Sequence, residues 1–493
     1  MRLLVVGNPH LAPALRALGH AVCDALVEHP DLCVPGVPFD VATLLARAGG
    51  TFDAVIVADA LGPPALPYGL EHVDLPRLFW AIDVHVNLFW QRHFARCFDL
   101  VLVAQRDYLP QIEAEGVPAH WLPWGIDTTI FHDAGRPRVH DLAFVGRLSA
   151  HRRKRSRILA HLAARFPHHA FATDPRRALD WAETAAVYQQ ARIVIGESML
   201  DDLTFRVFEG MACGALVLAE RAANGLTTLF PPGEVLDVFG PDDLVEKTAW
   251  WLAHDAERAE VAARGAALIA ARHDMRHRMA EVCALLGRGV PRRDTRGRGG
   301  RDWALAAYFG VARGLMEPAR TIPHVLAALA SAFAAGDVDG LLAIAELAAI
   351  TGEVERARRL LDHVGRMAPD DPRPAALAAA LAARAGDPID ASAALAVGRA
   401  LEAYGLGVWV GFAPAPGFDL PRTAWDWYLR GLAGGSSEAA LRAGELALGA
   451  GCIDAAVEVL SRAVELAPAD AHARARLATA RKRAYCCEAP GGP

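Results

Sequence analysis

The stretch from residue 192 to 219 constrains the fold of this chain more than any other. It begins with an apolar run that ends at Gly196, passes through a polar, acidic loop and enters a short helical segment. That segment carries Glu209, stops at Gly214 and leads directly into a second apolar run at 215–219. Strand, loop, helix and strand in this order predict a βαβ unit with a carboxylate near the start of its helix. In an open α/β sheet, ligands bind beyond the carboxyl ends of the strands, where this loop and this helix start lie.

The charge of Glu209 indicates which ligand group this helix start could bind. The first turn of a helix has unpaired N–H groups and favours anions, whereas Glu209 is itself an anion. A carboxylate in this place suits sugar hydroxyls, which donate hydrogen bonds, better than it suits phosphate. For this segment taken alone, a capped surface helix without a ligand is the alternative.

Short apolar runs alternate with helical patterns in two successive series, from residue 1 to 135 and from 136 to 289. Continuous apolar strands separated by helices are typical of doubly wound parallel sheets. The polar segment at 128–140, which contains Gly and Pro, marks the boundary between the series. The fold class is therefore α/β, and two such domains in tandem predict a ligand site in the cleft between them. The Arg- and Gly-rich stretch at 290–301 is expected to be a solvated linker.

From residue 302 to 485 the pattern is helical, and it contains an internal repeat. Gly352 and Gly386 are 34 residues apart, which is the period of tetratricopeptide (TPR) repeats. Gly451 begins a third unit, and each glycine is followed at the same spacings by an alanine and a leucine. Small residues let paired helices pack closely, so an all-α, TPR-like domain is expected. The segment at 404–431 interrupts the repeat, and its role is open.

Composition excludes several classes of protein. The net charge of −6 gives no global argument for binding nucleic acid. No apolar run approaches the roughly 18 residues of a membrane-spanning helix, and the first residues fit a strand better than a signal peptide. The eight cysteines are scattered without the spacing of zinc ligands. We therefore expect a cytoplasmic protein with reduced thiols, no metal site, no membrane span and a short tail at 486–493.

A family resemblance rests on the stretches 121–132, 141–159, 206–218, 224–265 and 273–282. In this order they resemble group 1 glycosyltransferases, and among these the branch related to the spore maturation protein CgeB. The resemblance implies a GT-B fold of two Rossmann-like domains, with the acceptor on the first and a nucleotide-sugar donor held mainly by the second. It also implies a transferase without a bound metal or cofactor, which uses a UDP-sugar or another nucleoside diphosphate sugar as co-substrate.

The same resemblance assigns donor-binding roles in the second series. Glu209 matches the acid that holds the donor ribose hydroxyls, and the family's other acid, eight residues earlier, is replaced by the shorter Asp201. The leaving group is a nucleoside diphosphate, so cations and backbone N–H groups beside a glycine are needed around it. These contacts are expected from Gly146, Arg147, Arg155, Thr204 and Arg206. Arg155 belongs to a basic cluster at 151–155, whose other members a solvated helix start would explain.

The first series offers candidates for the acceptor side. A strand end is followed by Asp83, His85 and Asn87, which would point the same way in an extended segment. An inverting transferase needs a base to take the acceptor proton, and Asp83 or His85 could supply it; a retaining enzyme would use them to hold the sugar. Asn8 and His10 lie in the first strand–helix loop and are expected at the same cleft, although helix capping explains Asn8 almost as well.

The sequence as a whole predicts a hexosyltransferase-type glycosyltransferase. Repeat regions of this kind usually bind peptides, so the TPR-like domain is expected to recruit a protein or peptide acceptor, such as a surface or flagellar protein, for O-glycosylation. A non-catalytic scaffold with a vestigial transferase domain is the main alternative, and a nucleotide-sugar epimerase is a second one. The sequence leaves a homo-oligomer open.

Overall fold

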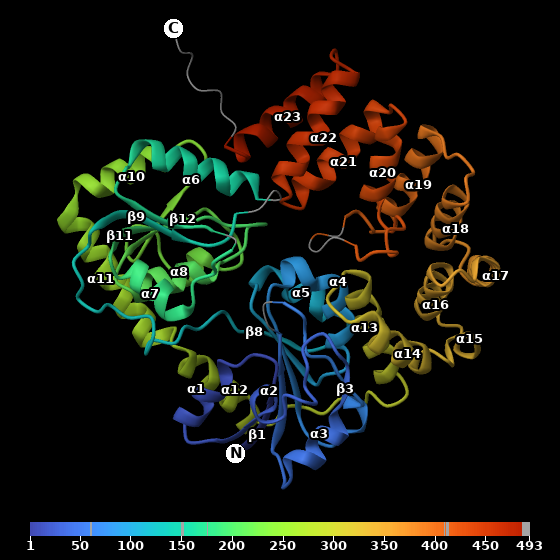
Figure 1. Cartoon of the computed structure of the whole chain (residues 1–493), viewed down its shortest axis with the longest axis horizontal. Helices are drawn as coiled ribbons and strands as arrows, with labels where there is room; N and C mark the ends of the chain where they lie inside the picture. Colours follow the sequence, from blue (N-terminus) through green and yellow to red (C-terminus); the bar gives the residue numbers. More distant parts are fainter. Residues whose placement is uncertain (60–61, 149–151, 175, 409, 411–413, 486–493) are drawn as a thin grey trace.

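The computed structural model describes the whole chain except residues 60–61, 149–151, 175, 409, 411–413 and 486–493. The expected tail and His151 of the basic cluster lie outside these described residues. The described chain forms two α/β domains and an arc of helices (Figure 1). None of its described helices is long and apolar enough to cross a membrane.

The first domain is built on a six-stranded sheet in which neighbouring strands are parallel. The strands lie in the order β2 (Ala21–Asp24), β1 (Arg2–Val6), β4 (Ala54–Ala58), β6 (Arg77–Ala81), β7 (Leu100–Val103) and β8 (Ala119–Trp121). Its helices are α1 (Leu11–Ala17), α2 (Ala25–Glu28), α3 (Val41–Ala48), α4 (Val84–Ala95) and α5 (Leu109–Glu113), and β3 (Phe39–Asp40) pairs with β5 (Pro67–Tyr68) beside it. Every residue of β4 and β6 is buried, because helices cover both faces of the sheet.

The second domain has a five-stranded parallel sheet. Its strands lie in the order β10 (His169–Ala172), β9 (His140–Val145), β11 (Ala191–Gly196), β12 (Leu216–Glu220) and β13 (Asp237–Phe239). The helices are α6 (Arg153–Arg165), α7 (Trp181–Tyr188), α8 (Phe205–Ala212), α9 (Leu226–Leu229), α10 (Leu244–Ala253), α11 (Asp255–Arg272) and α12 (Met275–Gly287). The βαβ unit expected at 192–219 is β11, α8 and β12.

Two Rossmann-like doubly wound domains followed by a helical region confirm the expected fold class, with the GT-B arrangement of its α/β part. The last helix of the second series, α12, crosses back and packs on α1 of the first domain. A bridge between Ile126 and Asp274 joins the two crossings of the chain between the domains.

The segment at 290–301 is not a solvated linker, because it packs into the first domain. Arg77 and Asp99 form a buried ion pair there, with 2.7 Å between Nη2 and Oδ1. The Arg77 guanidinium also donates hydrogen bonds to the Arg293 carbonyl and to Thr295 Oγ1, at 2.9 and 2.7 Å. A buried guanidinium has five N–H groups to satisfy, and this segment supplies acceptors that the sheet lacks.

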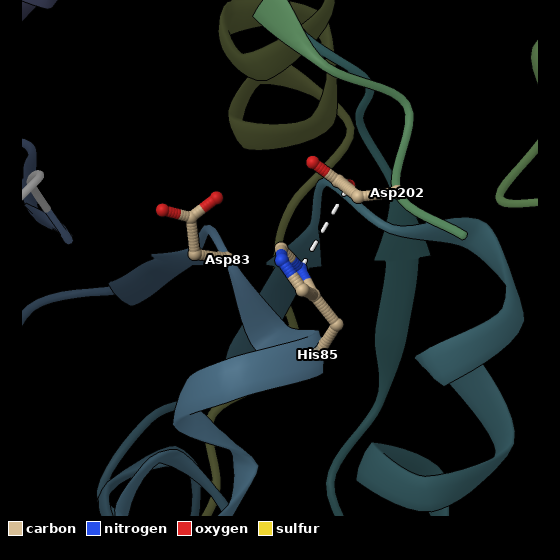
Figure 2. A group of neighbouring side chains, drawn as sticks. All are labelled: Asp83, His85 and Asp202. Carbon is tan, nitrogen blue, oxygen red and sulfur yellow. Dashed lines mark ion pairs between the residues drawn. The ribbon is translucent and has the colours of Figure 1, made fainter. Parts of the chain in front are cut away.

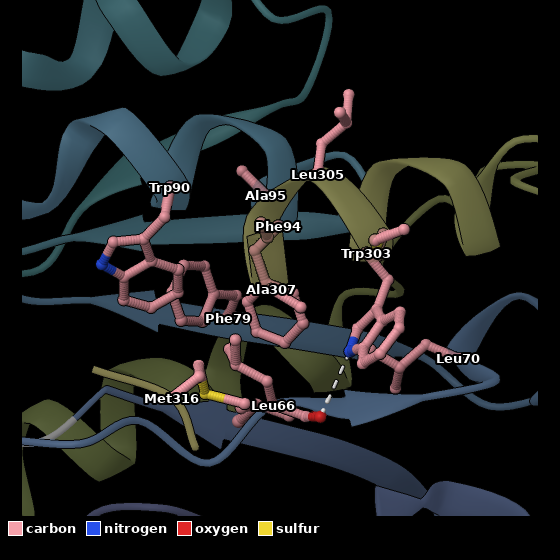
Figure 3. Packing of buried hydrophobic residues seen from close by; sticks show 14 of the residues in the cluster. Leu66, Leu70, Phe79, Trp90, Phe94, Ala95, Trp303, Leu305, Ala307 and Met316 are labelled. Carbon is pink, nitrogen blue, oxygen red and sulfur yellow. Dashed lines mark hydrogen bonds between the residues drawn. The ribbon is translucent and has the colours of Figure 1, made fainter. Parts of the chain in front are cut away.

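Helix α13 (Gly299–Ala312) belongs to the core of the first domain. Its apolar residues form one buried cluster with the sheet and with α4. Figure 3 shows Trp303 among these side chains, with its Nε1 donating a 3.2 Å hydrogen bond to the Leu66 carbonyl. The boundary expected at residue 302 therefore runs through a helix that both regions share.

The remaining helices form an arc, here called the array, which starts at the first domain and ends against the second (Figure 1). They are α14 (Pro318–Ala328), α15 (Ala332–Ala335), α16 (Val338–Ile350), α17 (Val354–Met367), α18 (Arg373–Arg384), α19 (Ala391–Ala403), α20 (Ala424–Ala433), α21 (Ser437–Gly449), α22 (Ile453–Leu466) and α23 (Ala471–Arg483). Gly352, Gly386 and Gly451 each lie between two helices with positive φ, which glycine adopts without strain. Helical hairpins are present where the repeat is expected, and their assignment as TPR repeats stays a prediction.

Candidate functional site

The carboxyl ends of the two sheets meet, and residues that follow their strands contact one another. Gln105, after β7, donates a 3.1 Å hydrogen bond from Nε2 to Oδ1 of Asp202, in the loop after β11. Asp107 and Asn224 exchange two hydrogen bonds between backbone N–H and side-chain oxygen, at 3.2 and 3.0 Å. Open α/β sheets bind ligands at these strand ends, so both domains contribute to one region.

The second sheet has its topological switch point between β9 and β11, and Arg206 of α8 occupies it. Arg206 Nε and Nη2 donate to the Val145 carbonyl at 3.2 and 3.1 Å, and Nη1 donates to the Glu197 carbonyl at 3.2 Å. Its guanidinium also lies 4.1 Å from the ring centroid of Phe144. A Cβ on Gly146 would lie only 2.9 Å from Arg206 Nη2. A larger residue at position 146 would therefore have to displace the Arg206 guanidinium from the strand end.

Glu209 lies one turn further along α8 and is the carboxylate without a partner at this edge. Its side chain is partly exposed, and no described residue donates a hydrogen bond to it or forms an ion pair with it. Burial raises the pKa of Glu209 to about 7, and the nearby charge of Arg206 opposes this rise. The carboxylate is therefore open to hydroxyl donors from outside the chain.

Thr204 precedes α8 as its N-cap residue. Its Oγ1 is buried, and no described residue forms a hydrogen bond with it. Buried hydroxyls in folded proteins nearly always have a partner. An anion at the start of α8 would accept from this hydroxyl and from the free backbone N–H groups of the first turn.

Arg155 is buried, contrary to the expectation that it meets a diphosphate. Its Nε donates to Glu197 Oε2 at 2.7 Å, and its Nη1 donates to the Arg147 carbonyl at 2.9 Å. Burial lowers the pKa of Arg155 to about 10, although Glu197 opposes the shift. Glu197 neutralises the charge of Arg155, and the hydrogen bond to the Arg147 carbonyl holds the loop after β9.

Arg152 is the cation of the basic cluster that faces the first domain. No described residue forms an ion pair with it, whereas Lys154 Nζ lies 2.8 Å from Glu220 Oε2. Burial raises the pKa of Asp83 and lowers that of His85; the positive charge of Arg152 opposes the first shift and adds to the second, across the domain boundary. Within the cluster, Arg152 is therefore a better candidate than Arg155 for stabilising a diphosphate.

Asp83 and His85 lie close together, and Asp202 of the second domain joins them (Figure 2). One oxygen or nitrogen atom of each lies within 4.8 Å of those of the other two. His85 Nδ1 is 3.8 Å from Asp202 Oδ1, is buried, and has no hydrogen-bond partner among the described residues. These three are the described residues that could hold a cation, and the expected metal-independent reaction stays a prediction.

Burial sets the protonation of this group. It raises the pKa of Asp83 to about 6, where the nearby His85 opposes the rise and Asp202 adds to it. Burial also raises the pKa of Asp202 to about 7, although the Gln105 hydrogen bond opposes this, and it lowers the pKa of His85. At neutral pH the imidazole is therefore a neutral base, and the carboxyls lie near their titration points.

The segment from Asp83 to Asn87 is not extended, so its side chains do not alternate as they would in a strand. Asp83 has left-handed backbone angles, φ 49° and ψ 38°, and helix α4 begins at the next residue. His85 still lies near Asp83 because it is in the first turn of that helix. Asn87 lies elsewhere: its Oδ1 accepts a 3.1 Å hydrogen bond from Trp90 Nε1, on the same helix. Asn87 thus has a local partner and does not join Asp83, His85 and Asp202, which are here called the acid–imidazole group.

Asn8 and His10 make contacts of different kinds: Asn8 bonds within its own loop, and the His10 ring reaches the second domain. Asn8 Oδ1 accepts a 3.0 Å hydrogen bond from the backbone N–H of His10, as local turn formation requires. The His10 ring stacks on Trp181 of the second domain, with 3.6 Å between ring centroids. His10 is therefore a contact between the domains, and burial lowers its pKa.

Asp202 lies with Asp83 and His85, whereas its neighbour Asp201, the residue singled out from the sequence, does not. Asp201, eight residues before Glu209, is exposed, has a positive φ, and lies 3.6 Å from Arg483 of the array. Asp202 is buried against the first domain instead. An acidic pair in the loop after β11 was the available signal, but only the fold decides which acid is buried.

Residues 138–284, most of the second domain, match the family described as Glycosyl transferase-like. None of the curated proteins matches this chain. Similar solved structures include sucrose-phosphate synthase from Thermosynechococcus elongatus, with 14% identity and a TM-score of 0.43 over 58% of this chain and 99% of the other. Another is HepE from Anabaena in complex with UDP, with 12% identity and a TM-score of 0.41 over 58% of this chain and 100% of the other. The second domain is therefore similar to the domains of this family.

Proposed function

We propose that this protein transfers a sugar from a nucleotide-sugar donor to a protein or peptide acceptor. The observation that carries the proposal is the placement of Glu209, an unpaired carboxylate beside the switch point of a glycosyltransferase-like domain. A carboxylate accepts two hydrogen bonds at once, which suits the adjacent hydroxyls of a ribose. Arg206 and the orphan hydroxyl of Thr204 lie one turn earlier, where the diphosphate of the same nucleotide would begin.

The acceptor side of the reaction would use Asp83 and His85. One of them takes the proton of the acceptor hydroxyl, whose oxygen forms a bond to the anomeric carbon of the sugar. The bond from that carbon to the diphosphate oxygen breaks, and its electron pair leaves with the nucleoside diphosphate. Arg152, which already acts on these two residues electrostatically, supplies positive charge as the leaving group forms.

The test is donor binding by the full chain and by Glu209→Gln. Calorimetry with UDP, and with UDP-glucose and UDP-N-acetylglucosamine, measures the affinity. Removing the charge weakens hydrogen bonds that are worth about 1.5–3 kcal/mol when one partner is charged, so we expect a loss of roughly 10- to 100-fold in affinity. The control is Glu257→Gln, which changes an exposed glutamate of the same domain and should leave binding unchanged.

Two outcomes would contradict the proposal. Equal affinity for the nucleotide in Glu209→Gln and in the unchanged chain would remove the ribose from this carboxylate. A chain that binds no nucleotide sugar and releases no nucleoside diphosphate in its presence would favour the scaffold alternative. Activity that survives EDTA would support the metal-independent reaction.

A further inference from the structure

A cavity of about 110 Å³ lies where the array meets the first domain. Helices α4, α13, α16, α18 and α19 all contribute to its wall, together with the segment after α19. Most of the described wall is apolar, including Leu305, Leu342, Leu377, Leu401 and Leu406. Apolar cavities of about 150 Å³ hold a benzene molecule, so this one has room for a single apolar side chain.

His93 is a buried polar residue in the wall of this cavity. Its side chain lies in the wall and only 9% of the residue is exposed, yet Nδ1 has no hydrogen-bond partner among the described residues. The ring stacks on Phe309, with 5.2 Å between centroids. Burial and the nearby Arg96 lower the pKa of His93 to about 3, so the imidazole is neutral. A neutral ring nitrogen without a partner suits one hydrogen bond from a bound group.

Charges at the cavity are paired, which indicates the nature of the ligand. Arg373 Nη1 lies 2.7 Å from Asp339 Oδ1 on one part of the wall. On another part, Arg422 pairs with Glu346, which also accepts a hydrogen bond from the Tyr308 hydroxyl. A charged ligand would have to break the buried Arg422–Glu346 pair and leave one of its charges without a partner, which is unfavourable. A peptide backbone is neutral and both donates and accepts hydrogen bonds, so it matches a wall with both kinds of group.

We propose that this cavity binds one apolar side chain of the polypeptide acceptor, in an extended conformation. The inference rests on the proposed function for the identity of the bound chain as an acceptor. It adds a specific recognition site to that function, and it places the site at the junction with α4, not along the array as a whole.

Helix α4 links this cavity to the acid–imidazole group. His93 and His85 are eight residues apart on one helix, which is about 12 Å along its axis at 1.5 Å per residue. An extended chain spans about 3.3–3.6 Å per residue. The hydroxyl residue that accepts the sugar should therefore lie about four residues from the apolar residue bound in the cavity.

The first experiment measures peptide binding in the absence of donor. The probes are fluorescein-labelled, capped nonapeptides of Gly and Ser with a central Leu, Phe or Gly. Fluorescence anisotropy with the full chain should show Leu or Phe peptides binding at least tenfold more tightly than the Gly peptide. Ala376→Leu, which fills the cavity, should abolish this preference, whereas Ala375→Leu on the exposed side of α18 should keep it. Thermal unfolding of both variants checks that they fold.

A second variant keeps the test decisive if Ala376→Leu fails to fold. Leu342→Ala enlarges the cavity and should shift the preference from Leu to Trp peptides by at least fivefold. Equal binding of all peptides, or equal behaviour of Ala376→Leu and Ala375→Leu, would overturn the proposal. Donor binding by Glu209→Gln tests the proposed function separately, because cavity binding is read without donor.

The spacing is tested by transfer. Peptides with one Ser at two, four or six residues from Leu, in an otherwise Gly and Ala background, are incubated with UDP-glucose, UDP-galactose and UDP-N-acetylglucosamine together. Mass spectrometry should find the largest modified fraction at four residues. Equal modification at all three spacings would overturn the placement of the acceptor along α4.

Discussion

The two ends of the array are held by opposite kinds of contact. At the first end, α14 packs on α13, which is buried in the apolar core of the first domain, where Trp303 is only 2% exposed. At the second end, α22 and α23 contact the second domain through polar groups. The backbone N–H of Lys154 donates a 2.9 Å hydrogen bond to Asp454 Oδ2, and Arg157 pairs with the same carboxylate. The array is thus a continuation of the first domain that touches the second.

The polar end of the array lies against the start of α6 and the loop before α8. Asp454 accepts from the first turn of α6, a helix whose own N-cap residue, Arg152, provides no side-chain cap. Arg483 lies 3.6 Å from Asp201, and Gly451 packs against Leu200 in the loop before α8. Ion pairs that are partly exposed are weak and sensitive to salt, whereas apolar cores are not. We therefore expect the contact of the array with the second domain to open more readily than its contact with the first.

The largest expected effect is at the apolar end. Trp303→Ala should lower the free energy of unfolding by about 3–5 kcal/mol, because truncating a buried aromatic side chain leaves a cavity. Denaturant titration of the full chain measures the loss. Trp250→Ala is the matched control, because that tryptophan is 47% exposed and its truncation should cost less than about 1 kcal/mol. A similar cost for both would show that α13 is not a structural part of the first domain.

The next effect concerns the contact between the two α/β domains, where Asp202 is buried. Burial raises its pKa in the folded chain to about 7, above the value of an exposed aspartate. The folded state therefore holds this proton more tightly than the unfolded state. The resulting stability is fully present below about pH 4 and is lost as the pH rises through 7. Asp202→Asn should avoid this loss and stabilise the chain at pH 8, by an amount on the order of 2 kcal/mol.

Thermal unfolding at pH 4.5 and pH 8 tests this dependence. The difference between Asp202→Asn and the unchanged chain should be small at the lower pH and should grow as the pH rises. Asp201→Asn changes the adjacent, exposed aspartate and should show no such growth. A constant difference at both pH values would mean that the Asp202 carboxyl is not protonated in the folded state.

Features that depend on neighbouring residues could be predicted from the sequence, whereas features that depend on residues far apart in the sequence could not. Strands such as β4 and β11 are visible in the sequence because their apolar runs depend only on local pattern and burial. The position of Glu209 on α8, between β11 and β12, could be predicted because the whole βαβ unit lies within one short stretch. The partner of Arg155 could not be found in this way, because Glu197 is 42 residues away and meets it only in the folded sheet. For the same reason Thr295, which bonds Arg77 across 218 residues, was placed in a solvated linker.

The hydrogen bond between Arg77 and Thr295 provides a second test of the contacts around the apolar end. Thr295→Val removes the hydroxyl that accepts from Arg77 Nη1 and leaves a buried donor unpaired. Such a loss costs about 1–3 kcal/mol, and it should be insensitive to salt because the group is buried. Denaturant titration at 0.05 and 1 M NaCl measures both properties. Thr295→Ser retains the hydroxyl and should recover most of the stability. If neither variant changes stability, the 290–301 segment is not anchored by the Arg77–Asp99 pair.

The smallest effect is expected at the polar end. Asp454→Ala removes the acceptor for the Lys154 N–H and the partner of Arg157, which should cost about 0.5–2 kcal/mol, as loss of a helix cap does. Hydrogen exchange should become faster in the first turn of α6 and in the loop before α8, with little change in α13. Glu458→Ala removes an exposed pair with Arg153 from the same helix and should have a smaller effect, about 0–1 kcal/mol. In 1 M NaCl the unchanged chain should approach the exchange pattern of Asp454→Ala, because screening weakens the same ion pairs. If α13 exchanges faster as well, the two ends of the array are coupled, and the array would close on the second domain as one rigid unit with the first.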